Sequence, residues 1–218
     1  MDPVPPPHSH YAVSERITDD PEKLLEFWFA DAAFSPGRAS ARSDMWFGSS
    51  PVLDRECRMR YGALLEAAGR GELDAWLAKA RPALALVVLL DQIPRNIFRG
   101  SARMFAFDGH ARTCAIAACD AGFVRELHPI EAAFLYLPFE HAEDLAMQDR
   151  GVEGLEALVR RADAGFREIL SGFAEYARRH REVIRRFGRF PHRNAVLGRA
   201  PTLDERAYLR GGGETFGA

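Results

Sequence analysis

Residues 82–99 read PALALVVLLDQIPRNIFR, and this stretch decides the fold. Its first part, 82–90, is an unbroken apolar run, which is typical of a central helix that is buried on all sides. Pro82 suits a helix start, and Pro94 is expected to stop the helix because proline lacks a backbone donor and clashes with the preceding turn. The pattern therefore predicts a central helix over 83–93, with the other elements packed around it.

Most of the remaining chain has apolar residues at spacings of three and four, which is the periodicity of helices. Asp20-Pro21 and Ser50-Pro51 are helix start signals, and Gly188 is an end signal. Further helices are expected over 23–30, 51–68, 72–79, 109–121, 130–140, 166–187 and 204–209, and the pattern also continues through 145–159. No stretch alternates apolar and polar residues. We therefore predict a single all-α domain over 18–218, with eight or nine helices stacked as antiparallel pairs, and a flexible proline-rich leader over 1–17.

The composition narrows the classes of protein. The 218 residues include 29 basic and 31 acidic ones, with a formal net charge of -2, which argues against a nucleic-acid partner. The longest apolar run is less than half of the ~20 residues that a membrane span needs, so no membrane partner is predicted. The three cysteines form no C-x-x-C pair, which predicts reduced thiols in the cytoplasm. No cofactor is predicted.

Charge is unevenly distributed along the chain. Segment 126–156 holds eight acids and one base, whereas segment 178–199 holds eight arginines and one acid. The simplest interpretation is that the two segments form ion pairs with each other in the fold. Any ligand site is then expected where this pairing is incomplete.

Polar side chains interrupt the apolar pattern at the end of the central helix. Asp91, Gln92, Arg95, Asn96 and Arg99 stand among large apolar residues. A buried polar group without a hydrogen bond costs roughly 1–3 kcal/mol, so these groups need partners or a cavity. They form either a helix C-cap or one wall of a pocket.

Two further clusters hold titratable side chains. Glu140, His141 and Asp144 form the first, and if 139–149 is helical, Glu140, Asp144 and Gln148 share one face. The other cluster consists of Arg189, His192, Arg193 and Asn194, in which an Arg-Asn pair after a proline echoes Pro94-Arg95-Asn96. If the three clusters form a common site, the fold must bring them close together in space.

Three stretches resemble a bacterial family known as domain of unknown function 924: LLDQIPRNIFRG at 89–100, FLYLPFEHAEDLAMQ at 134–148 and RHREVIRRFGRFPHRNAVLGR at 179–199. MWFG at 45–48 and EKLLEFWF at 22–29 also fit, and the resemblance covers 19–216. The matching positions are Asp91, Gln92, Pro94, Arg95, Asn96, Arg99, Glu140, His141, Asp144, His180, Arg189, Phe190, Pro191, His192, Arg193 and Asn194. Ile93 departs from the phenylalanine that is commoner in the family. The resemblance implies a tetratricopeptide-like superhelix and no particular activity.

The first functional hypothesis is a binding module for a small anionic ligand or a peptide end. Arginine with Asn and Gln offers planar donors that suit carboxylate or phosphate. The ligand-binding residues would be Asp91, Gln92, Arg95, Asn96, Arg99, Arg189, Arg193 and Asn194.

The alternative is an acid–base enzyme of hydrolase type that forms no covalent intermediate. Its catalytic residues would be His141, Glu140, Asp144 and His192, because histidine beside a carboxylate suits proton transfer near neutral pH. A metal variant would use His141, Glu140, Glu143 and Asp144, but their spacing fits no established ligand pattern, and no metal site is predicted. Phe27, Trp28, Phe29 and Trp46 form either core or the patch of a homodimer.

Overall fold

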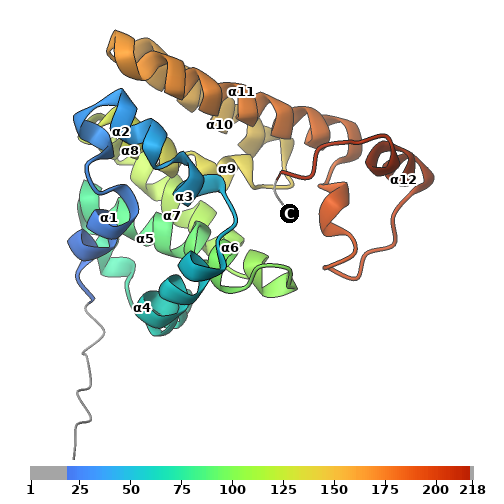
Figure 1. Cartoon of the computed structure of the whole chain (residues 1–218), viewed down its shortest axis with the longest axis horizontal. Helices are drawn as coiled ribbons and strands as arrows, with labels where there is room; N and C mark the ends of the chain where they lie inside the picture. The colour runs from blue at the N-terminus through green and yellow to red at the C-terminus, as the bar shows by residue number, and fades with distance from the viewer. Residues whose placement is uncertain (1–18, 217–218) are drawn as a thin grey trace, which may run out of the picture.

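The structure, a computed structural model, describes residues 19–216, and over this range it is all-α, without a strand (Figure 1). The predicted leader at 1–17 lies outside the described residues. The longer helices are α1 (Pro21–Phe29), α2 (Pro36–Ala41), α4 (Pro51–Gly69), α5 (Ala80–Asp91), α7 (Asp108–Asp120), α10 (Leu145–Arg161), α11 (Ala164–Phe187) and α12 (Leu203–Arg210). The predicted fold class is confirmed.

Short helical pieces join the longer helices. Those of α type are α3 (Ser43–Phe47), α6 (Ile93–Ile97), α8 (Pro129–Ala132) and α9 (Leu137–Glu140). Those of 3-10 type are η1 (Ala32–Phe34), η2 (Asp74–Ala78), η3 (Ala102–Phe105), η4 (Phe123–Arg125), η5 (Ala133–Leu135) and η6 (Pro191–Arg193). Many of them lie next to the candidate site described below, because a short helix can change the chain direction within a few residues.

Helix α5 is the centre of the core, as its apolar run predicts. Every residue from 83 to 90 is fully buried, and α5 packs against α1, α4 and α7. The helix ends at Asp91, and Pro94 lies in the first turn of α6, where its missing backbone donor costs nothing. The chain therefore turns just where polar residues replace the apolar run.

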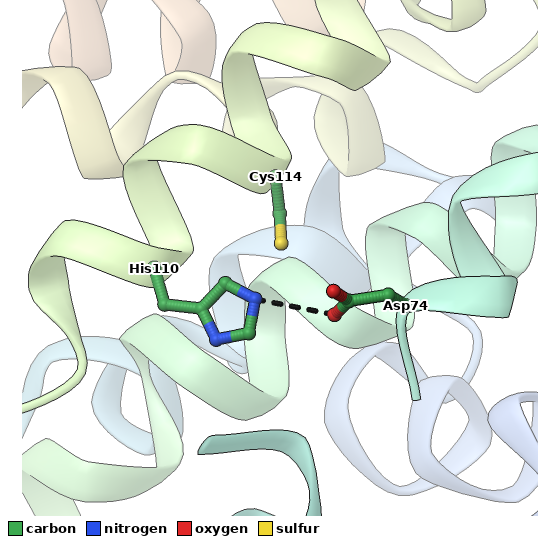
Figure 2. Close-up of side chains that lie close together, drawn as sticks. All are labelled: Asp74, His110 and Cys114. Atoms are coloured by element: carbon green, nitrogen blue, oxygen red, sulfur yellow. Dashed lines mark hydrogen bonds and ion pairs between the residues drawn. The ribbon is translucent and has the colours of Figure 1, made fainter. Parts of the chain in front are cut away.

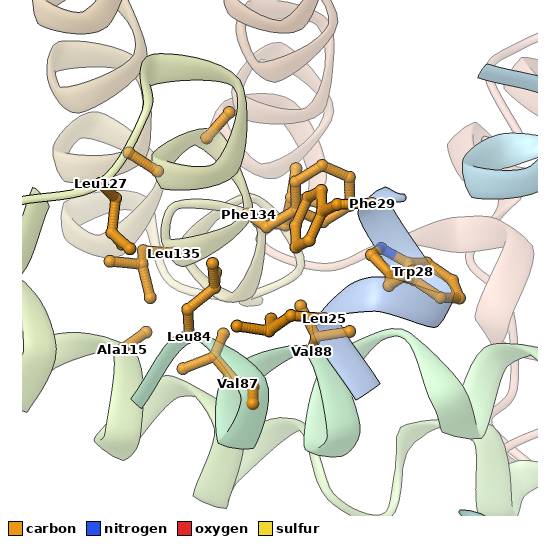
Figure 3. Packing of buried hydrophobic residues seen from close by; sticks show 14 of the residues in the cluster. Leu25, Trp28, Phe29, Leu84, Val87, Val88, Ala115, Leu127, Phe134 and Leu135 are labelled. Carbon is orange, nitrogen blue, oxygen red and sulfur yellow. The ribbon is translucent and has the colours of Figure 1, made fainter. Parts of the chain in front are cut away.

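Aromatic rings of α1 and α3 pack against Phe134 in the middle of the chain, and Figure 3 shows Trp28 and Phe29 of α1 near it. Phe134 in η5 is 1% exposed and meets Phe29 edge-on with ring centroids 4.9 Å apart. Trp46 approaches the same ring at 5.1 Å and Trp28 at 6.4 Å, both also edge-on. These aromatic residues belong to the core, so the interpretation of this group as a dimer patch is wrong for Trp28, Phe29 and Trp46.

Local capping signals explain most helix ends. Asp20 accepts a hydrogen bond from the Glu22 amide at 3.0 Å, and Ser50 caps α4 in the same way. Gly188 ends α11 with φ of 69°, a left-handed conformation that favours glycine. The expected single helix over 130–140 is wrong: the chain forms α8, η5 and α9 instead, with Pro138 in the first turn of α9.

Helices α10 and α11 form an antiparallel hairpin that lies along one side of the molecule (Figure 1). Three ion pairs join the acidic and the arginine-rich segments: Arg178–Glu156 at 2.7 Å, Arg181–Asp149 at 3.2 Å and Arg199–Glu143 at 2.6 Å. The prediction that these segments face each other is confirmed. None of the helices within 19–216 combines the length and hydropathy that crossing a bilayer requires.

The aromatic cluster gives a test of the core. Replacing Phe134 by Ala removes a ring that packs against five other aromatic residues, so we expect a loss of about 3–5 kcal/mol in the free energy of unfolding. Phe34→Ala is the matched control, because Phe34 is 81% exposed and should change stability by less than about 0.5 kcal/mol. Urea denaturation measures both, and equal losses would contradict the assignment of Phe134 to the core.

Candidate functional site

Members of all three predicted clusters meet around one partly open space, which we call the polar cavity. Its volume is about 140 Å³, and it lies where α6, α9, α11 and η6 approach each other. Its polar lining consists of Gln92, Arg95, Asn96, Arg99, Glu140, His141, Tyr176, His180, His192 and Arg193. Its remaining lining consists of Trp46, Phe47, Gly48, Met104, Phe105, Leu137 and Phe216. Residues more than 100 positions apart in the sequence thus share one cavity.

Asp91 lies just behind this lining and orients His141. The Asp91 carboxylate is 1% exposed, and its Oδ1 is 2.8 Å from Nδ1 of His141. Because a carboxylate only accepts hydrogen bonds, Nδ1 is the ring nitrogen that carries the proton, and Nε2 remains for a ligand. Burial and the nearby Arg95 lower the pKa of His141, so the imidazole is neutral at pH 7. This arrangement is that of an oriented general base.

The Asp91 carboxylate remains ionised although it is buried. Burial alone would raise its pKa, but His141 and Arg95 outweigh this effect and hold the pKa well below its usual range. Gln92 donates to the other carboxylate oxygen at 2.6 Å, and Arg95 donates at 3.2 Å. The end of α5 is therefore an ionic centre from which the side chains of the cavity are placed.

Arg95 also contacts Asp108, the first residue of α7, at 3.0 Å. Asp108 in turn lies 3.6 Å from Arg193 of η6, so this one carboxylate faces two arginines. Burial raises the pKa of Asp108. When Asp91 is included, the two carboxylates Asp91 and Asp108 face the two guanidinium groups of Arg95 and Arg193. The negative and positive charges in this group are therefore equal in number. The cavity thus has no net negative charge that would exclude an anion.

The guanidinium of Arg193 is held between two aromatic rings. Its central carbon lies 4.5 Å from the centroid of Phe105 and 4.3 Å from that of Phe190. Both of its polar contacts, with the carbonyl of His141 at 3.1 Å and with Asp108, use Nη1. Its faces are covered and one edge is occupied, so among the described residues the Nε–Nη2 edge is left for a planar oxyanion. Burial and Arg95 lower the pKa of Arg193 to about 10, and it remains a cation at pH 7.

Three buried nitrogen atoms around the cavity have no hydrogen-bond partner within the described part of the chain. They are Nε of Arg95, Nε of Arg193 and Nδ1 of His192. Burial also lowers the pKa of His192 to about 4, so its ring is neutral at pH 7. Buried polar atoms are nearly always paired, and unpaired ones need an explanation. Here a ligand or water with acceptor oxygens would satisfy the two arginine donors.

Glu140 and His180 form a neutral pair in the lining of the cavity, and the His180 ring lies 6.2 Å from the ring of His141. Oε1 of Glu140 is 3.3 Å from Nδ1 of His180, and each side chain is 3% exposed. Burial raises the pKa of Glu140 to about 8, and burial lowers the pKa of His180 well below its ordinary value. Nδ1 of His180 also lies 3.0 Å from the carbonyl of Tyr176, to which it donates. At pH 7 this contact therefore joins two uncharged groups, and the protonated carboxyl of Glu140 holds a proton that it can give up.

Asp144 does not line the polar cavity, so its assignment as a catalytic residue is corrected. It is exposed and caps α10, accepting hydrogen bonds from the amides of Ala146 at 2.9 Å and Met147 at 3.1 Å. The expected common helical face of Glu140, Asp144 and Gln148 does not form either, because α9 ends at Glu140. Gln148 instead donates to the carbonyls of Glu140 and Ala142 and so holds the connecting loop.

Arg189 and Asn194 are also placed away from the cavity, although both were predicted to bind the ligand. Arg189 forms an ion pair with Glu205 at 2.6 Å, and Asn194 donates to the same carboxylate at 3.2 Å. Both side chains therefore hold the segment before α12. The echo between the two Arg-Asn pairs is not a repeat of function, since Asn96 lines the cavity and Asn194 does not.

Sequence reasoning missed several residues of the site, among them Asp108, His180 and Tyr176. Asp108 stands just before the helix expected over 109–121, but Phe107 occupies the N-cap position and the Asp108 side chain contacts Arg95. No feature of the local sequence distinguishes an acid that pairs with an arginine of the site from an ordinary acid at the start of a helix. His180 had a signal: it lies on the buried face of α11, at spacings of three and four from Ala177 and Ile184.

A separate group of potential metal ligands lies between η2 and α7 (Figure 2). Asp74, His110 and Cys114 each offer a ligand atom, and these atoms lie within 4.8 Å of one another. His110 already contacts Asp74 at 3.2 Å, and burial raises the pKa of the Cys114 thiol to about 12. A metal ion would have to displace the thiol proton, and none of these three residues lines the polar cavity. His110 and Cys114 are four residues apart, which places both on one face of a helix. The sequence therefore held a signal for this group, which the spacing between cysteines alone does not show.

The model of one protein family matches residues 24–213, and its description is "Bacterial protein of unknown function (DUF924)". The chain belongs to this family. A solved structure described as a protein of unknown function, ATU0120 from Agrobacterium tumefaciens, is similar, with 37% identity and a TM-score of 0.74. The similarity covers 88% of this chain and 97% of that one. A search of curated proteins finds no match. Because the family description names no activity, we infer the function of this DUF924 protein from its cavity.

The raised pKa of Glu140 gives a prediction about stability and pH. Between its usual pKa and about 8, the folded state holds a proton that the unfolded state has lost, so stability falls as pH rises. Glu140→Gln removes this proton equilibrium, and we expect the fall between pH 7 and 8, about 1 kcal/mol per pH unit, to disappear. The histidines of the cavity contribute equally in both proteins, so the difference between the two slopes reports Glu140. Urea denaturation at pH 7 and 8 measures the slope, and identical slopes in both proteins would refute the assignment.

Proposed function

We propose that this protein is an acid–base enzyme of hydrolase type that acts on a small anionic compound held in the polar cavity. The observation that carries the proposal is the contact of 2.8 Å between buried Asp91 and His141. It leaves Nε2 of an uncharged imidazole on the cavity side, where a substrate or a water molecule would lie. A site that only binds has no need of a histidine oriented in this way.

Two carboxylic acids with different pKa values have different roles in the proposed reaction. One supports the base, His141, and the other is the acid. Asp91 stays ionised and supports His141, whereas Glu140 stays protonated at pH 7. Nε2 of His141 would take a proton from water while the water oxygen bonds to the acyl or phosphoryl centre of the substrate. Glu140 would give its proton to the leaving group as the bond to that group breaks. Proton return from His141 to Glu140, directly or through solvent, restores both groups.

The anion would bind at Arg193. Its aromatic neighbours fix the plane of the guanidinium, and the remaining edge suits two oxygen atoms of one phosphate or carboxylate. Arg95 and His192 add the two other unpaired nitrogens on the same cavity. Bound there, the anion would satisfy buried donors that otherwise lack acceptors.

A binding module without turnover is the second candidate, and the Arg193 edge alone favours it. Such a module would hold the same small anion, or the carboxylate end of a peptide, in the same cavity. The two candidates differ only in the role of His141 and Glu140. Binding and turnover therefore need separate tests.

Anion binding is tested with inorganic phosphate and two matched arginine variants. Arg193→Lys keeps the positive charge but loses the planar edge, so we expect phosphate affinity to fall by about 10- to 100-fold. Arg185→Lys is the control, because Arg185 is exposed on α11, pairs within residues 19–216 only with the neighbouring Glu182 and does not line the cavity. Isothermal titration calorimetry measures both. Equal affinities in the two variants would exclude Arg193 as the anion site.

Turnover is tested with a panel of phosphate monoesters and of esters and amides that carry a free carboxylate. His141→Asn keeps an N–H donor near the position of Nδ1 for the hydrogen bond to Asp91 but removes the base, so we expect kcat to fall by about 10²- to 10⁴-fold on any substrate that the wild type turns over. Asp144→Asn is the control, because asparagine is an equally good helix cap and Asp144 lies outside the cavity. Phosphate binding without turnover of any panel member would favour the binding module.

A further inference from the structure

A second space lies beside the polar cavity, and we call it the apolar groove. Its volume is about 630 Å³, and it runs between α2, α3 and α11. Much of its wall is apolar or lacks a side chain: Phe47, Leu137, Ile169 and Phe173, with Gly37 and Gly172. The groove is therefore suited to an apolar group and differs in character from its neighbour.

The groove and the polar cavity adjoin each other. Phe47, Leu137, Glu140 and Tyr176 line both spaces. Glu140 is uncharged at pH 7, so the acid at the junction would repel neither an anion in the cavity nor a hydrocarbon chain in the groove. A single ligand can therefore occupy both spaces without placing a charge at the junction.

The volumes of the two spaces and the charges of their linings indicate which end of the ligand lies in each space. Small-molecule sites usually have volumes of about 300–1,000 Å³, so the polar cavity alone would hold only a head group, whereas the groove has ordinary ligand size. No lysine, arginine or histidine within 19–216 lines the groove, and its second acid, Glu168, is solvent-exposed. An anionic group must then lie at Arg193, and the rest of the molecule extends past Phe47 into the groove.

We propose that the substrate is a phosphate or carboxylate that bears an apolar chain, with the chain lying in the groove between α2 and α11. This inference rests on the proposed anion site at Arg193. It narrows the substrate from any small anion to an amphipathic one. The chain would contact Ile169 and Phe173 while the head group receives the arginine donors.

Gly172 allows the groove to be filled without touching the polar cavity. A Cβ built at Gly172 meets no atom within 4 Å, so a larger side chain there enters open space. The residue lies inside α11, where leucine is a better helix former than glycine, and Gly172→Leu should therefore fold. Gly62→Leu in α4 is the matched control, because Gly62 also faces open space and lines neither the groove nor the cavity.

The experiment compares methyl, butyl and hexyl phosphate by isothermal titration calorimetry. For the wild type and Gly62→Leu we expect affinity to rise by up to about four-fold per added methylene, the value for full burial of each group. For Gly172→Leu we expect methyl phosphate to bind as in the wild type, but the gain with chain length to be lost. A parallel series of acetate, pentanoate and heptanoate distinguishes a phosphate head group from a carboxylate one.

The outcomes separate the two proposals. If methyl phosphate binds through Arg193 but longer chains add nothing, the groove inference is overturned while the anion site stands. If the chain-length gain persists in Gly172→Leu, the chain lies elsewhere and the inference is again overturned. If Arg193→Lys binds every phosphate as well as the wild type does, the anion site itself is wrong, and the groove inference fails with it.

Discussion

The buried carboxylate of Asp91 is the constraint on which the site depends. It ends the most apolar helix of the protein and is 1% exposed, so its charge has to be compensated by nearby groups. Arg95, four residues later, supplies an opposite charge, and the neutral His141, fifty residues later, supplies a hydrogen bond. Arg95 then attracts Asp108, and Asp108 faces Arg193. The buried charge of Asp91 and the contacts that follow from it therefore link the ends of α5 and α9 with α6, α7 and η6.

The carboxyl-terminal part of the chain is held to this point by a second set of charges. Glu143, in the loop after His141, accepts hydrogen bonds from the backbone of Phe190 at 2.8 Å and from Arg199 at 2.6 Å. Glu205 in α12 holds the same segment in a similar way, because its carboxylate accepts hydrogen bonds from Arg189 and Asn194. Because these pairs fix the course of residues 188–202, they place Arg193 and His192 at the cavity. Arginines that bind the protein itself are therefore as necessary to the site as those that line it.

Much of the fold followed from local patterns, and the physical reasons are visible at particular residues. The apolar run of α5 predicted a central helix, and Gly188 predicted the end of α11 because only a left-handed residue continues the chain there. The segment at 130–140 was less predictable. Its apolar content is compatible with one helix, but Pro138 and tight packing divide it into three short pieces. Local propensity indicated helix in each piece but not the turns between them.

By itself, the sequence determined the helical class, the central helix and the set of polar clusters from which a site is built. Only the tertiary structure decided which members of those clusters face the cavity. Arg189 and Arg193 are four positions apart and chemically identical, yet one contacts Glu205 and the other lines the cavity. Asp144 caps a helix, while Asp91, fifty residues before His141, orients its ring. The physical reason is that an ionic side chain takes the partner that is nearest in space, and that partner exists only after the helices have packed.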